Sequence, residues 1–310
     1  MIRAGLLAGL VLVGPVAAQD LPGQVLCRDV WAQLTDLAAS VFSLTGQVTP
    51  SNIEGCLVTD LRIDMPGQYV PDWHIESLHL TGALPWIVDG SAPPDRLGLR
   101  LSGLRMVVQS DNPQMDYLLA AQSRTNLIDV ALALRWDAPA RVLTVERLEI
   151  DFPGANRVAL TARVAGVDLS SKGAMQMSAT SFAVTEADLR VQTHGLFEWY
   201  VLLAFGAMVL PLEGDMEAAT EGLRAQAVAA VAELPETSFP AASKFALVAF
   251  VNELPNPSGT LTLSLRSVAG VGPARLMRYA MTGIPKTLAG AAPLLDGVTV
   301  NIGWTHEDQQ

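Results

Sequence analysis

Five segments of the chain share one spacing of apolar residues, and this spacing constrains the fold most strongly. Each segment has an apolar residue, two others, a second apolar residue, one other and a third apolar residue. The segments are Val58–Ile63, Ile75–Leu80, Leu101–Met106, Val145–Ile150 and, less regularly, Val184–Leu189. Alternation of period two is typical of a strand with one apolar face, and a one-residue slip inside it is what a β-bulge produces. The pattern therefore predicts five bulged strands in a curved sheet.

Other segments alternate without a slip. Ile128–Trp136 and Val158–Val164 each place apolar residues on one face, and turn residues at 137–139 and 153–156 suggest hairpin connections. The repeats are irregularly spaced, which argues against a solenoid or a propeller. Leu261–Leu265 and Val298–Trp304 are expected to be returning strands. An antiparallel meander with one apolar face fits this pattern best.

Helical spacing appears at both ends of the chain and once between strands. From Cys27 to Phe42 apolar residues recur every three or four positions, and Asn112-Pro113 is a good start for a short helix. Further helices are expected at 196–212, 216–234, 241–254 and 274–281, with Phe245, Val248, Ala249 and Val251 on the inner face of the third. The predicted fold is thus α+β: a large curved antiparallel β-sheet, a meander with bulges, covered by helices from the N-terminus and the C-terminal third. Residues 19–310 are expected to form one β-rich domain, with a helix at 19–45, strands over 55–192, and helices followed by returning strands over 193–310.

The first eighteen residues are typical of a signal peptide. Arg3 precedes the apolar run Ala4–Val13, Gly14-Pro15 breaks it, and small residues follow, so cleavage is expected between Ala18 and Gln19. The run is shorter than the roughly 20 residues that span a membrane, so no transmembrane anchor is expected after cleavage. This predicts a periplasmic protein. Because that compartment is oxidising, we expect Cys27 and Cys56 to form a disulfide that joins the first helix to the first strand.

Composition and motifs narrow the possible functions. Half of the 310 residues are hydrophobic and 16% are charged, which is enough apolar material for a full core, and the formal charge of −11 disfavours nucleic acid and anionic headgroups as partners. The sequence contains no GxSxG, HExxH, P-loop or GxGxxG motif, so no catalytic residue, metal ligand or cofactor is predicted. His74 and His79 are an odd number of residues apart in a strand, which predicts opposite faces and no local metal pair.

The segment Leu196–Leu212 is unusual because it is apolar on every side from Trp199 onward. We expect a helix buried between the sheet and other helices; a hairpin that contacts membrane or lipid is the alternative, and a true span would need more residues. The possible membrane- or ligand-contacting residues are Trp199, Tyr200, Leu203, Phe205 and Met208. The apolar sheet face poses a similar choice: it could be a filled core, which we expect, or a groove for an apolar ligand.

The strand repeats and the stretch Leu254-Pro-Asn-Pro-Ser-Gly-Thr-Leu-Thr-Leu263 resemble exported envelope proteins of Gram-negative bacteria, with a strand pattern similar to that of the AsmA-like group. The resemblance covers residues 55–305 as a pattern and transfers no functional residue. It implies an envelope role that involves lipid. The leading expectation is a non-enzymatic periplasmic protein that binds a hydrophobic ligand or lipid-related envelope component; the alternatives are an assembly partner for an envelope protein and a hydrolase with a dispersed site.

Overall fold

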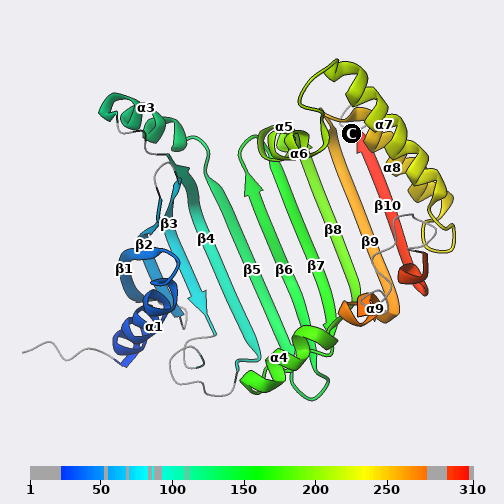
Figure 1. The fold of residues 1–310 in the computed structure, drawn as a ribbon. Coiled ribbons are helices and arrows are strands. Elements are labelled where there is room, and N and C mark those ends of the chain that lie inside the picture. Colours follow the sequence, from blue (N-terminus) through cyan, green and yellow to red (C-terminus); the bar gives the residue numbers. More distant parts are fainter. Residues whose placement is uncertain are drawn as a thin grey trace, which may run out of the picture.

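The chain folds into one sheet whose ten antiparallel strands follow each other in sequence order (Figure 1). The computed structural model describes residues 22–51, 55–67, 70–82, 86, 93–108, 110, 112–277 and 292–306. The strands are β1 Ser43–Ser51, β2 Gly55–Asp64, β3 Asp72–Thr81, β4 Arg96–Val107, β5 Ile128–Asp137, β6 Val142–Phe152, β7 Asn156–Ala165, β8 Ala183–His194, β9 Ser258–Val271 and β10 Val298–His306. The predicted α+β fold with an antiparallel meander is confirmed. The signal peptide and its cleavage site at Ala18 and Gln19 lie outside the described residues.

The helices lie before the sheet and in the connections between its strands. They are α1 Pro22–Ala38, α3 Pro113–Ser123, α4 Lys172–Ser181, α5 Leu196–Tyr200, α6 Leu202–Val209, α7 Met216–Glu233, α8 Ala241–Glu253 and α9 Pro273–Met277, with a short 3-10 helix, η1, at Ala292–Leu295. The Asn112 side chain caps α3 by accepting hydrogen bonds from the amides of Gln114 and Met115, as its position before Pro113 predicted. Residues beyond Met277 of the helix expected at 274–281 are outside the described part.

The slips in the alternation coincide with irregularities in strand register. In the β4–β5 pair, Leu101 is opposite Val130 and Leu104 is opposite Ile128, so two residues of β4 face Asp129 alone. One of them, Gly103, has φ +68° and donates its amide hydrogen to the Asp129 carboxylate at 2.9 Å. Comparable shifts interrupt the β6–β7 and β8–β9 pairs at the slips of β6 and β8. The predicted bulges are confirmed in β2, β4, β6 and β8, where they let the same face stay apolar along the strand, whereas the pairs of β3 show no register shift.

The sequence pattern missed two elements. The edge strand β1 contains Gly46 and Pro50 and only two large apolar residues, Leu44 and Val48, so it lacks a readable alternation. Proline is tolerated there because one side of an edge strand needs no ladder hydrogen bonds. The helix α4 consists mainly of Ser, Thr, Gly, Ala and Met, and begins where the Ser171 hydroxyl accepts a hydrogen bond from the Ala174 amide. Neither segment carries the apolar periodicity on which the predictions relied.

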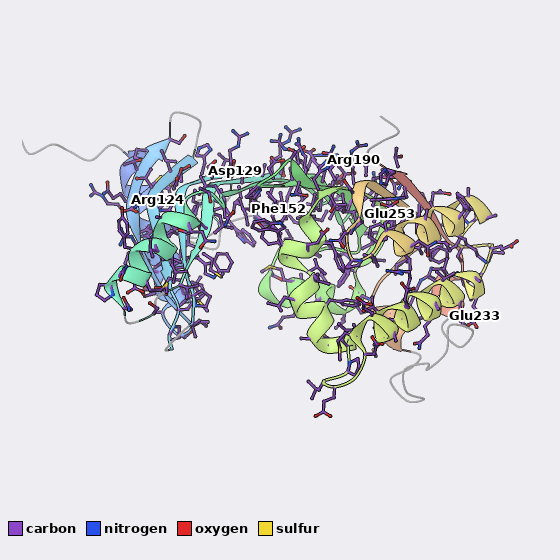
Figure 2. The ribbon with its side chains drawn as sticks, turned by 90° about the horizontal axis from the view of Figure 1, so that it is seen from above. Arg124, Asp129, Phe152, Arg190, Glu233 and Glu253 are labelled. Atoms are coloured by element: carbon purple, nitrogen blue, oxygen red, sulfur yellow. A yellow bond between two sulfur atoms is a disulfide. The ribbon has the colours of Figure 1, made fainter. Side chains whose placement is uncertain are left out.

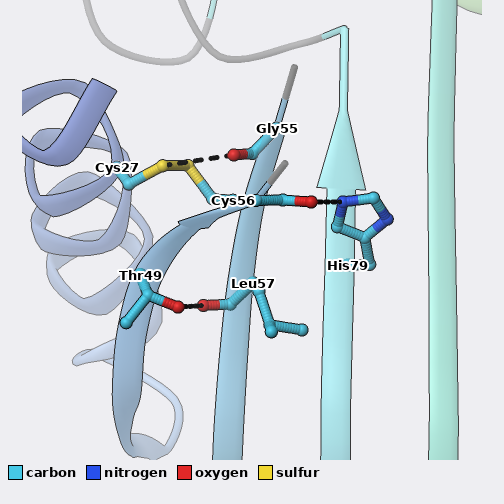
Figure 3. Close-up of a disulfide and its surroundings, with 7 residues drawn as sticks. Cys27, Thr49, Gly55, Cys56, Leu57 and His79 are labelled. Carbon is cyan, nitrogen blue, oxygen red and sulfur yellow. Dashed lines mark hydrogen bonds between the residues drawn. A yellow bond between two sulfur atoms is a disulfide. The ribbon is translucent and has the colours of Figure 1, made fainter. Parts of the chain in front are cut away.

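The disulfide between Cys27 and Cys56 joins α1 to β2, as predicted (Figure 3). Both cysteines are buried with Val30, and Leu34 and Leu80 pack against them. The helix begins at Pro22, so Cys27 lies in its second turn rather than its first, and it ends at Ala38. Val41, which the helical spacing placed on the inner face, lies beyond the end of the helix and is exposed, and Leu37, in its last turn, is exposed as well.

The helix α8 protects the far edge of the sheet. The Ser243 hydroxyl accepts a hydrogen bond from the Ile302 amide of β10, and the Ser238 carbonyl accepts one from Val300. Phe250 packs edge-on against Trp304 at 5.0 Å, whereas Phe245, expected on the inner face, is exposed. These contacts occupy backbone groups that an edge strand would otherwise offer to another chain.

Candidate ligand-binding groove

Apolar side chains from neighbouring strands lie opposite each other in continuous rows across the sheet. The middle row runs from β2 to β10 through Cys56, Leu80, Leu99, Leu132, Leu148, Leu160, Leu189, Leu263 and Ile302. A second row runs beside it through Val58, Leu78, Leu101, Val130, Ile150, Val158, Val191, Leu261 and Trp304. A third row, from β4 to β10, contains Leu97, Leu134, Val145, Ala162, Ala187, Leu265 and Val300. One face of the sheet is therefore apolar along its whole width.

This face is covered at its two ends and open between them. At one end α1 lies on β1–β3, where Val58, Leu61 and Ile75 are buried; at the other, Val298 and Val300 of β10 are buried beside α8. The row residues of β4–β9 are all only partly buried. Among the described residues of these six strands, Trp136 is the one fully buried apolar side chain of this face. The two ends of this face are therefore buried, whereas the rows between them are only partly buried.

Figure 2, seen along the strands, shows how the sheet and helices enclose this middle part. The strands at the N-terminal end of the sheet turn down from the central strands, and α5–α8 lie on the same side at the other end. Phe152 points to this inner side, while Asp129 and Arg190 lie on the outer side. The apolar rows of β4–β9 lie on this inner side between the two covered ends, and we call the face that they form the apolar groove.

Aromatic residues lie near both ends of the strands that carry the groove. Tyr200 of α5 packs on Phe152, the last residue of β6, with ring centroids 4.9 Å apart. Burial raises the pKa of the Tyr200 phenol. At the opposite end of the strands, the Trp136 indole donates a hydrogen bond to the Val167 carbonyl at 3.0 Å. Both rings are therefore held in place at the groove's ends.

The outer face of the sheet is polar and charged. Arg266 makes two 2.9 Å hydrogen bonds to the Asp188 carboxylate, and these bonds lower the pKa of Asp188. Arg157 pairs with both Glu149 and Asp151. A hollow of about 590 Å³ over β6–β10 is lined by such side chains, Glu149 and Arg190 among them, together with residues of the middle row. These ion pairs are partly exposed and contribute little stability each, so we regard this face as solvated surface.

The histidines are placed differently from the prediction. In the register of the sheet, His74 is opposite Arg62 and Arg105, and His79 is opposite Arg100, so both lie on the outer face. The prediction of opposite faces was wrong because the slip between the two residues restores the same face. They are still about 16 Å apart along the strand at 3.3 Å per residue. No group of three metal-binding side chains occurs within the described parts of the chain.

The residues singled out in 196–212 gather at one end of the strands and are largely exposed. Instead of one buried helix, the segment forms α5 and α6, and Trp199, Leu203, Phe205 and Met208 are exposed along with Tyr200. The expectation of burial is therefore wrong for these side chains. In the described parts of the chain, no helix is long and apolar enough to cross a membrane.

Comparison with known proteins assigns no relative. No protein-family model matches the chain, and no curated protein matches it with significance.

Proposed function

We propose that this protein is a periplasmic lipid-binding protein that holds hydrocarbon chains in the apolar groove of β4–β9. The observation that carries the proposal is the half-buried state of three in-register apolar rows, because water-exposed apolar surface of this extent is unfavourable unless something covers it. The groove offers little to a polar ligand, since its charged residues point to the outer face.

The dimensions of the groove suit extended hydrocarbon chains. Strands in a sheet are about 4.8 Å apart, so six strands span about 24 Å along each row. The chains of one bilayer leaflet occupy about 15 Å, half of a hydrocarbon core of roughly 30 Å. Rows are about 7 Å apart, because every second residue of a strand faces the same side. A row is thus long enough for one extended acyl chain, and the three rows offer room for two chains side by side.

Independent features support the proposed compartment. The N-terminal pattern of an export signal and a disulfide that joins α1 to β2 both favour an oxidising compartment. The similarity in strand pattern to AsmA-like envelope proteins favours the same compartment and a lipid ligand. With no catalytic constellation along the groove, a binding role suits these side chains better than a hydrolytic one.

The test is to purify the protein from the periplasm of its own host without detergent and to analyse it by native mass spectrometry. We expect adducts of lipid mass that organic extraction removes and that return when the extracted lipid is added back. Protein that carries no lipid and takes none up would refute the proposal. A stoichiometric protein partner seated on the groove would favour the role of an envelope assembly partner instead.

A further inference from the structure

Two helical connections project from the same end of the sheet. Because the strands alternate in direction, β4 and β8 end at the same side, where α3 follows β4 and α5–α6 follow β8 (Figure 1). The β6–β7 turn next to Phe152 lies at this end too. This end of the groove is therefore flanked by α3 and α5.

The side chains at this end are apolar and exposed to an unusual degree. In and after α6, Leu203 is 87% exposed, Met208 84% and Leu212 98%, and Trp199 of α5 is 73% exposed. On α3, Tyr117 is 73% exposed and is flanked by partly exposed Met115 and Leu118. Such patches are rare on proteins that remain free in water and indicate a surface that contacts another phase or molecule.

Side-chain contacts fix the exposed helix α6 and the neighbouring α5 to the rest of the protein. Phe205 packs edge-on against Phe197 of α5 at 6.5 Å, and Tyr200 anchors α5 on Phe152. The Glu198 carboxylate accepts a hydrogen bond from Asn256 at 2.9 Å, which links α5 to the segment before β9. Apolar surface is thus continuous from the second row of the groove, through Phe152 and Tyr200, to α6.

The charge pattern identifies the partner. Residues 199–212 carry no charge, and the carboxylates of Glu198 and Glu213 flank them, so this end would repel an anionic surface. Trp and Tyr side chains favour the boundary between headgroups and hydrocarbon. A neutral, zwitterionic bilayer meets both conditions, whereas a protein partner would need complementary polar contacts around the apolar centre.

We infer that α5–α6 and α3 form a membrane-docking end that inserts its exposed apolar side chains into a zwitterionic bilayer, with the groove opening directly at the membrane surface. This inference rests on the proposed function, because it gives the groove a route for exchanging lipid with a bilayer. It adds that contact is interfacial and independent of anionic lipid.

The experiment is flotation of the purified mature protein with vesicles of phosphatidylcholine and phosphatidylethanolamine, at low and high salt. The docking variant is Leu203→Glu with Met208→Glu. The matched control is Met177→Glu with Val268→Glu, which replaces two exposed apolar residues near the opposite end of the strands. We expect the natural protein and the control to float equally at both salt concentrations and the docking variant to bind at least about tenfold more weakly.

Equal flotation of the docking variant and the control overturns the inference, as does binding that requires phosphatidylglycerol or disappears at high salt. Self-association through this end without vesicle binding also overturns it. Uptake of a water-soluble fluorescent fatty acid, measured on the same samples without vesicles, tests the groove separately. If the docking variant takes up the fatty acid normally, the groove proposal survives whatever the flotation result, and if no sample takes it up, that proposal fails even where flotation succeeds.

Discussion

A charge placed in the middle row should abolish lipid binding with little effect on folding. Leu132 of β5 lies in the centre of the groove, between Leu99 and Leu148. In Leu132→Glu, a bound chain loses roughly half the burial of one leucine, about 1 kcal/mol, and must cover a carboxyl group that becomes neutral on burial, about 1–3 kcal/mol. Together these effects of about 2–4 kcal/mol predict binding that is weaker by about 30-fold to several hundredfold.

The matched control lies one residue away. Ala133 points to the outer face, opposite Arg147, so Ala133→Glu adds the same charge where it finds a cation and cannot reach the groove. Affinity is measured by titration with a fluorescent fatty acid, and stability by urea unfolding. We expect Leu132→Glu to lose binding and Ala133→Glu to keep it, with similar unfolding midpoints. Equal affinity of the two variants would refute the assignment of the groove to this face.

Three further predictions concern stability. Replacing Cys27 and Cys56 by alanine removes a disulfide that closes a loop with a sequence separation of 29. The chain-entropy relation gives a decrease of about 3.6 kcal/mol in the free energy of unfolding, measured in urea. An unchanged unfolding midpoint under oxidising conditions would contradict a stabilising role of the disulfide. Gly103→Ala should destabilise the protein by about 1–3 kcal/mol, because φ is +68° and a Cβ would lie 2.4 Å from the Glu76 side chain. The control is Gly222→Ala on α7, where a Cβ would meet open space, and it should leave the stability unchanged or raise it. Burial, followed by the charges of Arg62 and Arg105, lowers the pKa of His74. The unfolded chain therefore binds the proton more readily, and stability should fall as the pH drops below about 6.5. His74→Gln should flatten this part of the plot of stability against pH, and an unchanged slope would argue against His74 as its cause.

The sequence was most informative for local features, where the spacing of a few neighbouring residues fixes the backbone geometry. The slip between Leu101 and Leu104 predicted the bulge that Gly103 forms against Asp129, and Asn112-Pro113 predicted the start of α3. Prediction failed where the alternation of apolar residues is weak, and where the face of a side chain was assigned by counting residues across a slip. The slip between His74 and His79 reversed the expected faces, and β1 carried too few apolar residues to be recognised.

The candidate site depended on a different kind of information. The residues that share the apolar face could be read from the chain, because alternation along a strand assigns each side chain to one side. Whether that face is covered depends on where the helices lie relative to distant strands, and a leucine in a filled core has the same local pattern as one in an open groove. The placement of α1 and α8 over the two ends, the partial burial of the rows between them, and the exposure of Leu203, Met208 and Leu212 therefore became known from the three-dimensional arrangement alone.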